Sequence, residues 1–162
     1  MTNPLSYGTL TTMPNGPGAG TDNLTSLPSA TALGQGVLDF SAAPVYDCVI
    51  APMKVKSGST GTSASGLLTG YIITSEDNTV WTDGISPTSA SDQSAKIATA
   101  MVAFQIAVVA NATTYQTPEV SIFAILGFVP RYAALVVYNQ SGHALDTTST
   151  NFYEKYSITS YV

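Results

Sequence analysis

Short runs of β-branched and aromatic residues, separated by clusters of Gly, Pro, Asn, Asp and Ser, follow one another from residue 37 onward. Apolar runs of this length between turn residues are typical of β-strands. No strand-like run alternates regularly with a long helical pattern, so a parallel βαβ sheet is not expected. The pattern predicts an all-β fold with about eight strands in two packed sheets, a jelly-roll-like β-sandwich over residues 37–162.

The individual strands are expected where the apolar runs lie. These ranges are 37–40, 45–51, 53–56, 67–75, 79–82, 96–110, 117–126, 131–138 and 151–161. Residues 67–75 and 79–82 should form a hairpin around Glu76-Asp77-Asn78, because Asp and Asn tolerate the left-handed backbone conformation of a tight turn. Residues 96–110 also fit helical spacing. We favour a strand there, with a turn near Thr99, because the second half of the segment is β-branched.

Residues 1–36 have a different composition, dominated by Thr, Gly, Pro, Asn and Ser, with widely spaced leucines. Proline fixes φ and withholds a hydrogen-bond donor, and no periodic apolar face emerges. We therefore expect an extended N-terminal arm that buries its apolar side chains on another protein, and a disordered terminus is the alternative. Its expected anchor residues are Leu5, Tyr7, Leu10 and Leu24.

Charge is scarce: only 9% of the residues are charged and the net charge is -5, whereas Thr and Ser supply 40 residues. Four Lys and one Arg cannot form a basic surface, so direct nucleic-acid binding is not expected. The longest mostly apolar run, residues 97–110, is too short to span a bilayer, so no membrane partner is expected. The sequence begins without a signal-peptide pattern, which indicates synthesis in a cytoplasm.

Candidate catalytic and metal-binding residues are few. His143 is the only histidine, follows Ser141-Gly142 in an expected turn, and lacks a Gly-x-Ser-x-Gly serine partner. A glycosidase pair would have to come from Glu76, Asp77, Asp83, Glu119 and Glu154, which are better explained as turn and solubilising residues. The single cysteine, Cys48, cannot form an internal disulfide and fits a small core position. We expect no catalytic residues, no metal site and no cofactor, and hence no enzyme.

Trp81 and the nine tyrosines leave a second function open. Aromatic faces can stack on sugar rings, so Trp81, at an expected sheet edge, is a candidate glycan contact. The chain would then be a carbohydrate-binding or adhesion module of a phage tail or cell surface. Packing in the core or in an interface explains the tyrosines equally well.

Two stretches carry a resemblance to a known family: residues 70–84, GYIITSEDNTVWTDG, and residues 129–145, VPRYAALVVYNQSGHAL. In the second, Pro130-Arg131-Tyr132 leads into an apolar strand and a Gly-containing turn. Together they cover about a fifth of the chain and resemble the C-terminal part of the head decoration, or cement, proteins of tailed bacteriophages. Their motif is structural, so no active-site residue is carried over.

The resemblance implies a structural virion protein on the outer capsid surface, where a jelly-roll-like domain ties neighbouring capsomers together and stabilises the head. Its partners would be the major capsid protein and copies of itself, as a homodimer in the first place and a trimer as the alternative. An extended arm suits this role, because it adds binding area across a seam and many copies on one lattice bind collectively.

Overall fold

The computed structural model describes residues 5–14, 24–42, 44–61 and 65–161. Within these residues the chain is all-β, as expected, and its strands are antiparallel. The strands are β1 (Leu5–Tyr7), β2 (Thr11–Thr12), β3 (Thr31–Asp39), β4 (Val45–Ile50), β5 (Lys54–Lys56), β6 (Leu67–Ser75), β7 (Met101–Ala107), β8 (Thr114–Gln116), β9 (Val120–Ser121), β10 (Tyr132–Gln140) and β11 (Lys155–Tyr161). The helical elements are α1 (Ile122–Leu126) and the 3-10 turns η1 (Thr82–Gly84), η2 (Ser94–Lys96) and η3 (Ser149–Asn151).

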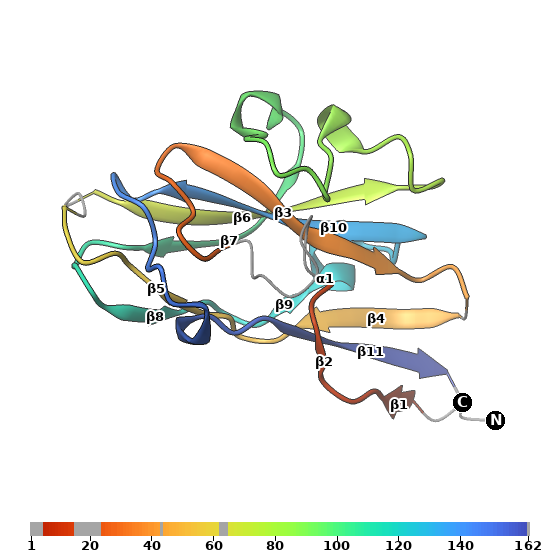
Figure 1. Cartoon of the computed structure of the whole chain (residues 1–162). Helices are drawn as coiled ribbons and strands as arrows, with labels where there is room; N and C mark the ends of the chain where they lie inside the picture. Colours follow the sequence, from red (N-terminus) through yellow and green to blue (C-terminus); the bar gives the residue numbers. More distant parts are fainter. Residues whose placement is uncertain (1–4, 15–23, 43, 62–64, 162) are drawn as a thin grey trace.

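The strands form two main sheets, which lie as two layers (Figure 1). One sheet has the order β3-β10-β6-β7, and the other has the order β1-β11-β4-β9, with β2 also paired to β11. A smaller pair, β5–β8, continues the second layer at one end (Figure 1). Apolar side chains from both sheets meet in one core, because Leu135 of β10 and Ile50 of β4 belong to the same buried cluster.

Strand β10 is the centre of the first sheet and is buried on both faces. It pairs with β6 without a break from Tyr132↔Ser75 to Gln140↔Leu67, and with β3 on its other side. Its side chains alternate between two clusters: Ala133, Leu135 and Val137 join the core between the sheets, whereas Ala134 and Val136 face the opposite way. Burial on both faces explains the uninterrupted apolar run at 133–137, since no position in it contacts water.

The outer face of this sheet is covered by residues 76–100, which we call the covering loop. Figure 1 shows it in green, above the layer of β3, β6, β7 and β10. Trp81 and Ile85 project from it and are buried against Ala134 and Val136. The loop therefore supplies the second apolar layer that β10 requires.

The covering loop also seals the free edge of β3. The Ala32 N–H donates to the Asp92 carboxylate over 2.8 Å, and the Gln93 N–H donates to the Ala32 carbonyl over 2.9 Å. At Gly34 the loop passes so close that an added Cβ would lie 2.2 Å from the Pro87 carbonyl oxygen. A glycine is required there because any side chain would push the loop away.

Aspartates fix the ends of the covering loop through hydrogen bonds to its backbone. The Asp83 carboxylate accepts hydrogen bonds from the backbone N–H groups of Ala98, Thr99 and Ala100 and from the Thr99 hydroxyl, over 2.6–3.0 Å. These donors, the Thr99 hydroxyl first, favour the ionised form and lower the Asp83 pKa to about 2. Asp77 accepts from Val80 and Thr79 in a similar turn, and its pKa is lowered as well.

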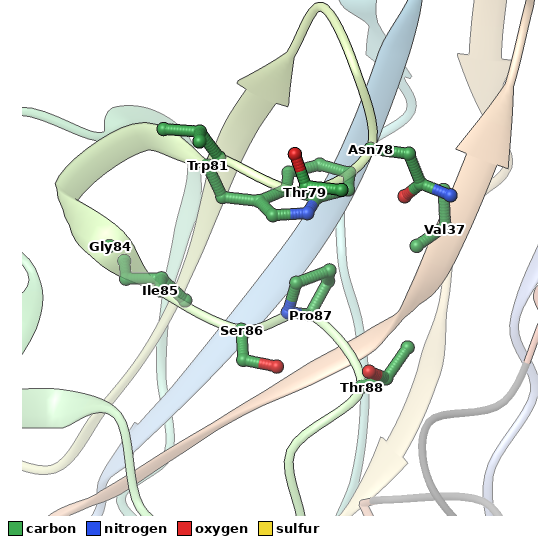
Figure 2. A pocket seen from close by; sticks show the side chains of 10 residues that line it. Val37, Asn78, Thr79, Trp81, Gly84, Ile85, Ser86, Pro87 and Thr88 are labelled. Atoms are coloured by element: carbon green, nitrogen blue, oxygen red, sulfur yellow. The ribbon is translucent and has the colours of Figure 1, made fainter.

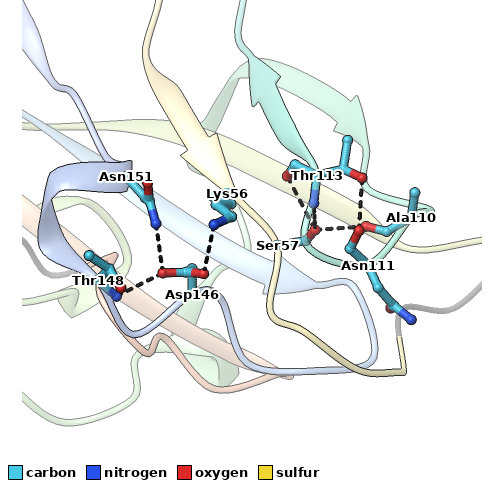
Figure 3. A network of polar contacts seen from close by, with 8 residues as sticks. All are labelled: Lys56, Ser57, Ala110, Asn111, Thr113, Asp146, Thr148 and Asn151. Carbon is cyan, nitrogen blue, oxygen red and sulfur yellow. Dashed lines mark hydrogen bonds and ion pairs between the residues drawn. The ribbon is translucent and has the colours of Figure 1, made fainter.

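A third aspartate organises the opposite end of the molecule (Figure 3). Asp146 accepts from the Asn151 side chain over 2.9 Å and from the Thr148 N–H over 2.8 Å, and it pairs with Lys56 over 3.4 Å. The same donors, Asn151 first, lower its pKa to about 2. Beside this network, the Ser57 hydroxyl donates to the Ala110 carbonyl over 2.7 Å, which ties the turn between β7 and β8 to the end of β5.

Most of the predicted strands are confirmed. Residues 67–75 form β6 with the expected bounds. Strands β4, β5, β7 and β11 lie within the expected ranges 45–51, 53–56, 96–110 and 151–161. Strand β10 was expected at 131–138 and continues to Gln140. The ambiguous segment 96–110 is a strand from Met101 to Ala107, preceded by the η2 turn. No helix in this described part of the chain is long and apolar enough to cross a bilayer.

The predicted boundary between arm and sandwich is corrected. Strand β3 begins at Thr31 and lies inside a sheet, so residues 31–36 belong to the domain rather than to an arm. The glycines of this segment serve close packing, since a Cβ on Gly36 would lie 1.5 Å from the Pro14 carbonyl oxygen. Of the stretch assigned to the arm, residues 1–4 and 15–23 lie outside the described residues.

The predicted hairpin of residues 67–82 is wrong in its second half. Residues 79–82 form no strand, because β7 occupies the side of β6 that they would have used. The turn residues instead lead into the covering loop, where Trp81 is drawn onto the outer face of the sheet. One of the two stretches that carry the family resemblance thus has a different shape from the one expected.

The predicted strand 117–126 is also wrong, because it contains β9 followed by α1. The Ser121 hydroxyl caps the helix by accepting the Ala124 N–H over 2.9 Å, and Asp47 accepts from both the Ser121 hydroxyl and the Phe123 N–H. Gly127 ends the helix at φ 78°. A serine cap and a glycine end six residues apart were the signals for a short helix in the sequence.

We expect the chain to lose stability as the pH falls from about 4 toward 2. The folded-state pKa values of Asp83 and Asp146 are lowered to about 2 from an unfolded value near 3.9, so their stabilisation is present above pH ~4 and lost as both states become protonated. Asp83→Asn keeps a residue that tolerates φ 58° but removes the charge. Urea midpoints should be lower for Asp83→Asn than for the native chain at pH 7, and the two should converge near pH 2.

The matched control is Glu76→Gln, at an exposed carboxylate that makes no side-chain hydrogen bond to the described residues. It should leave the midpoint unchanged at both pH values. An equal effect of the two substitutions at pH 7 would contradict the role given to Asp83.

Candidate functional site

The expected anchors of the arm are found in three different settings. Leu5 and Tyr7 lie on β1, where they pair with Tyr161 and Thr159 of β11. Leu10 lies between β1 and β2 and is 53% exposed. The described part of the arm therefore runs along the edge of its own sheet and leaves Leu10 available to a partner.

Leu24 is corrected as an anchor, because it is fully buried in the core of its own domain. It begins a turn in which the Leu27 N–H donates to the Leu24 carbonyl over 3.0 Å. The Asn139 side chain, at the end of β10, holds this turn by donating to the Leu27 carbonyl over 2.9 Å. A leucine in a Pro- and Gly-rich segment thus belongs to the core of the domain, which spacing alone did not indicate.

Trp81, the expected glycan contact, is only 8% exposed and packs in the cluster under the covering loop. A hollow of about 470 Å³ lies beside it, between residues 78–81 and 84–88 of the loop. Figure 2 shows the indole and the Pro87 ring facing this hollow, with Asn78, Thr79 and Val37 near one end. The buried indole supports the loop and offers little surface for a sugar to stack on.

An exposed aromatic residue does line another hollow, on the opposite layer. Tyr153 is 40% exposed and contributes to a hollow of about 460 Å³ with Pro52, Lys54, Tyr115 and Gln116. The Lys155 ammonium lies 5.0 Å from the centre of the Tyr153 ring. This hollow, which we call the Tyr153 hollow, combines an aromatic side with hydrogen-bond donors, and sequence analysis missed it because residues 52–54 and 153–155 meet only through strand pairing.

His143 lies in the turn after β10, with its ring against Gly61. A Cβ added to Gly61 would lie 2.1 Å from the imidazole Nε2. A hollow of about 320 Å³ beside it is also lined by Ser59 and Asp146. Within the described residues the imidazole makes no hydrogen bond to a serine or a carboxylate, and Asp146 is engaged by Asn151, Thr148 and Lys56. The hydrogen-bonded chain of a catalytic triad is therefore not formed here.

Two of the acidic residues considered for a glycosidase pair have a structural role instead. Asp77 and Asp83 accept backbone N–H groups of the covering loop. Among the described residues no group of His, Cys, Asp and Glu is arranged to hold a metal ion. Cys48 is fully buried, and its burial raises its pKa to about 12, which makes the thiol unreactive at neutral pH.

Three exposed aromatic side chains of the described residues lie on or near α1. Tyr46 of β4 stacks on Phe123 of α1, with ring centres 5.7 Å apart, and Phe128 follows the helix directly. Their exposed fractions are 38%, 41% and 52% in that order. We call these three residues the α1 aromatic group. Large aromatic side chains left in water on one side of a domain are typical of a surface that another protein covers.

Comparisons with known proteins add no identification. No protein-family model matches the chain, and no curated protein matches it.

A pair of leucine substitutions distinguishes core from surface in the N-terminal segment. Leu24→Ala should lower the free energy of unfolding by about 2–5 kcal/mol, because it leaves a cavity in a packed core. Leu10→Ala should change it by less than about 0.5 kcal/mol, since the side chain is already in water. Urea denaturation of both variants measures the difference, and similar losses for the two would contradict the placement of Leu24.

Proposed function

We propose that this chain is a structural virion protein that binds the outer surface of a tailed-phage capsid and cements neighbouring major capsid protein subunits. The observation that carries the proposal is the strand order, which supports a jelly roll. Counting β1/β2 as the first strand, followed by β3, β4, β6, β7, β9, β10 and β11, the two sheets read 1-8-3-6 and 2-7-4-5. An eight-stranded jelly roll has this strand order, which supports that fold for this chain, with β5 and β8 as extensions of the third and sixth strands.

Jelly rolls are frequent in viral capsid proteins and in lectins. The surface favours the first of these roles. The chain has only 9% charged residues, and the α1 aromatic group and Leu10 are exposed apolar side chains. Removing neutral and aromatic surface from water costs little free energy, whereas burying a charge in a contact between proteins requires its desolvation, which costs much more. Such a surface suits permanent contact with a protein shell.

The arm keeps a role in this proposal, in a shorter form. Strands β1 and β2 pair along β11 at the edge of the second sheet, and Leu10 between them is exposed. A capsid subunit that contacts this edge would cover Leu10 and extend the sheet contact, in the manner of strand addition.

We expect the native chain to co-sediment with purified heads of the phage that encodes it, at a fixed number of copies per head. Deletion of residues 1–12 should weaken this binding by about tenfold or more, the effect of losing anchor contacts worth about 1.4 kcal/mol. The deletion stops before Met13, which is buried in the core, so the domain should still fold. Quantitative gel densitometry of the sedimented heads measures the occupancy.

Phe128→Ser tests the α1 aromatic group in the same assay, and Val80→Ser is its matched control, because Val80 is 74% exposed on the covering loop. Full occupancy by the truncated chain would exclude the arm as a capsid contact. Absence of the native chain from purified heads, in both sedimentation and mass spectrometry, would refute the cement function itself.

Carbohydrate binding remains the second candidate, and the Tyr153 hollow is what favours it. If the chain is a lectin-like module, a glycan array should show binding that Tyr153→Ala abolishes, because the exposed ring is the stacking surface. Trp81→Ala is a poor test, since it removes a buried side chain. Phe128→Ala serves as the control on a distant aromatic residue, and an array without any bound glycan would rule this function out.

A further inference from the structure

The two main sheets have four outer strands, and three of these edges are short or covered. The covering loop seals β3 through hydrogen bonds to Ala32 and Gly36. Strands β1 and β9 span only three and two residues. Strand β7 differs, because it spans seven residues and pairs with β6 on one side only, with a shift of register at Ala103, and no other described backbone bonds to its outer side.

This open edge also lacks two of the usual protections against pairing, charge and proline, and has only a shift of register at Ala103. Natural proteins place charges, prolines or bulges that turn the edge away on free strands, because unpaired N–H and C=O groups bind any passing strand. No charged residue occurs anywhere between residues 97 and 118, and β7 contains no proline. Met101 and Val102 are about half exposed at the start of the strand. A long, neutral, half-apolar edge is thus left open, whereas the β3 edge is covered and the β1 and β9 edges are short.

We propose that β7 is the interface between two copies of this chain, which pair edge to edge as antiparallel strands about a twofold axis. Two identical strands satisfy each other in this arrangement, because each donates and accepts the same set of hydrogen bonds. The distribution of charge favours this edge as the contact between copies. The chain carries a net charge of -5, so two copies repel each other over most of their surface. The neutral β7 edge is where they approach without this electrostatic repulsion. A basic partner would gain nothing at β7. This inference does not depend on capsid binding.

The surroundings of β7 add area to the contact. A strand of seven residues is about 23 Å long, and pairing two of them joins both four-stranded sheets into one continuous sheet. Helix α1 lies beside β7, so exposed Phe123 and Phe128 flank the junction. Their burial helps to reach the roughly 800 Å² per partner that a stable dimer requires.

The first experiment measures mass by sedimentation velocity over a wide range of concentration. The native chain should have twice the mass of the 16.8 kDa monomer. Val102→Lys and Gln105→Lys should each raise the dissociation constant of the dimer by at least about a hundredfold, because a charge on an edge strand faces a like charge across the axis. Val80→Lys, at a more exposed valine on the covering loop, should leave the dimer intact.

Cysteine scanning then tests the pairing itself. Cys48 is buried and unreactive, so a single cysteine introduced at positions 101 to 107 is the reporting thiol. In an antiparallel pair only the residue at the twofold axis faces its own copy, at a Cα distance of about 5 Å that a disulfide can bridge. Crosslinking under mild oxidation should therefore peak at one position and fall on both sides, with Val80→Cys as the control.

Mixing Gln105→Lys with Gln105→Glu provides the rescue, since opposite charges across the axis should restore a dimer that neither variant forms alone. A native chain that stays monomeric, or has a trimeric mass, would overturn the proposal. So would a dimer that survives both lysine substitutions, or crosslinking that does not vary along β7. Circular dichroism spectra confirm that each variant is folded before its mass is interpreted.

Discussion

The burial of residues 133–137 of β10 on both faces of the sheet is the constraint on which the rest of the structure depends. A strand covered on both faces needs two apolar layers, and this chain provides one from the opposite sheet and the other from the covering loop. The loop must then be held in place, which explains the aspartates at its turns and the glycines on β3 that allow its close approach. Even Trp81 is drawn into this arrangement and becomes a support for the sheet instead of a binding surface.

Sequence patterns predicted the strands that follow period-two or fully apolar rules, such as β6 and β10. They failed where a tertiary partner decided the outcome. Residues 79–82 have the composition of a strand, but β7 takes the position that they needed beside β6. Gly34 and Gly36 lie in the segment that was assigned to an extended arm, whereas they mark the close contacts of a strand. In segment 120–127 the sequence does contain the signals of a short helix, the capping serine and the terminal glycine. The alternation of apolar residues favoured a strand and led to the wrong prediction.

Surface sites were harder to predict than the fold. Leu24 and Leu10 occur in similar sequence surroundings, yet one is in the core and the other in water, because only the end of β10 determines where the chain turns back. The α1 aromatic group and the Tyr153 hollow each combine residues far apart in the chain, which strand register alone brings together. The longest segment of the sequence without a charge, residues 97–118, includes β7, whose outer edge pairs with no other described strand.

The pairing of β1 and β2 with β11 has a consequence for how the chain is made. The first strands wait for a partner that the ribosome synthesises about 140 residues later, so this sheet cannot close during most of translation. Until then β4 lacks its β11 neighbour and the core between the layers stays accessible. Folding dominated by such distant contacts is slow, and closure of the second sheet is expected to be a late step, completed after the central sheet around β10 has formed.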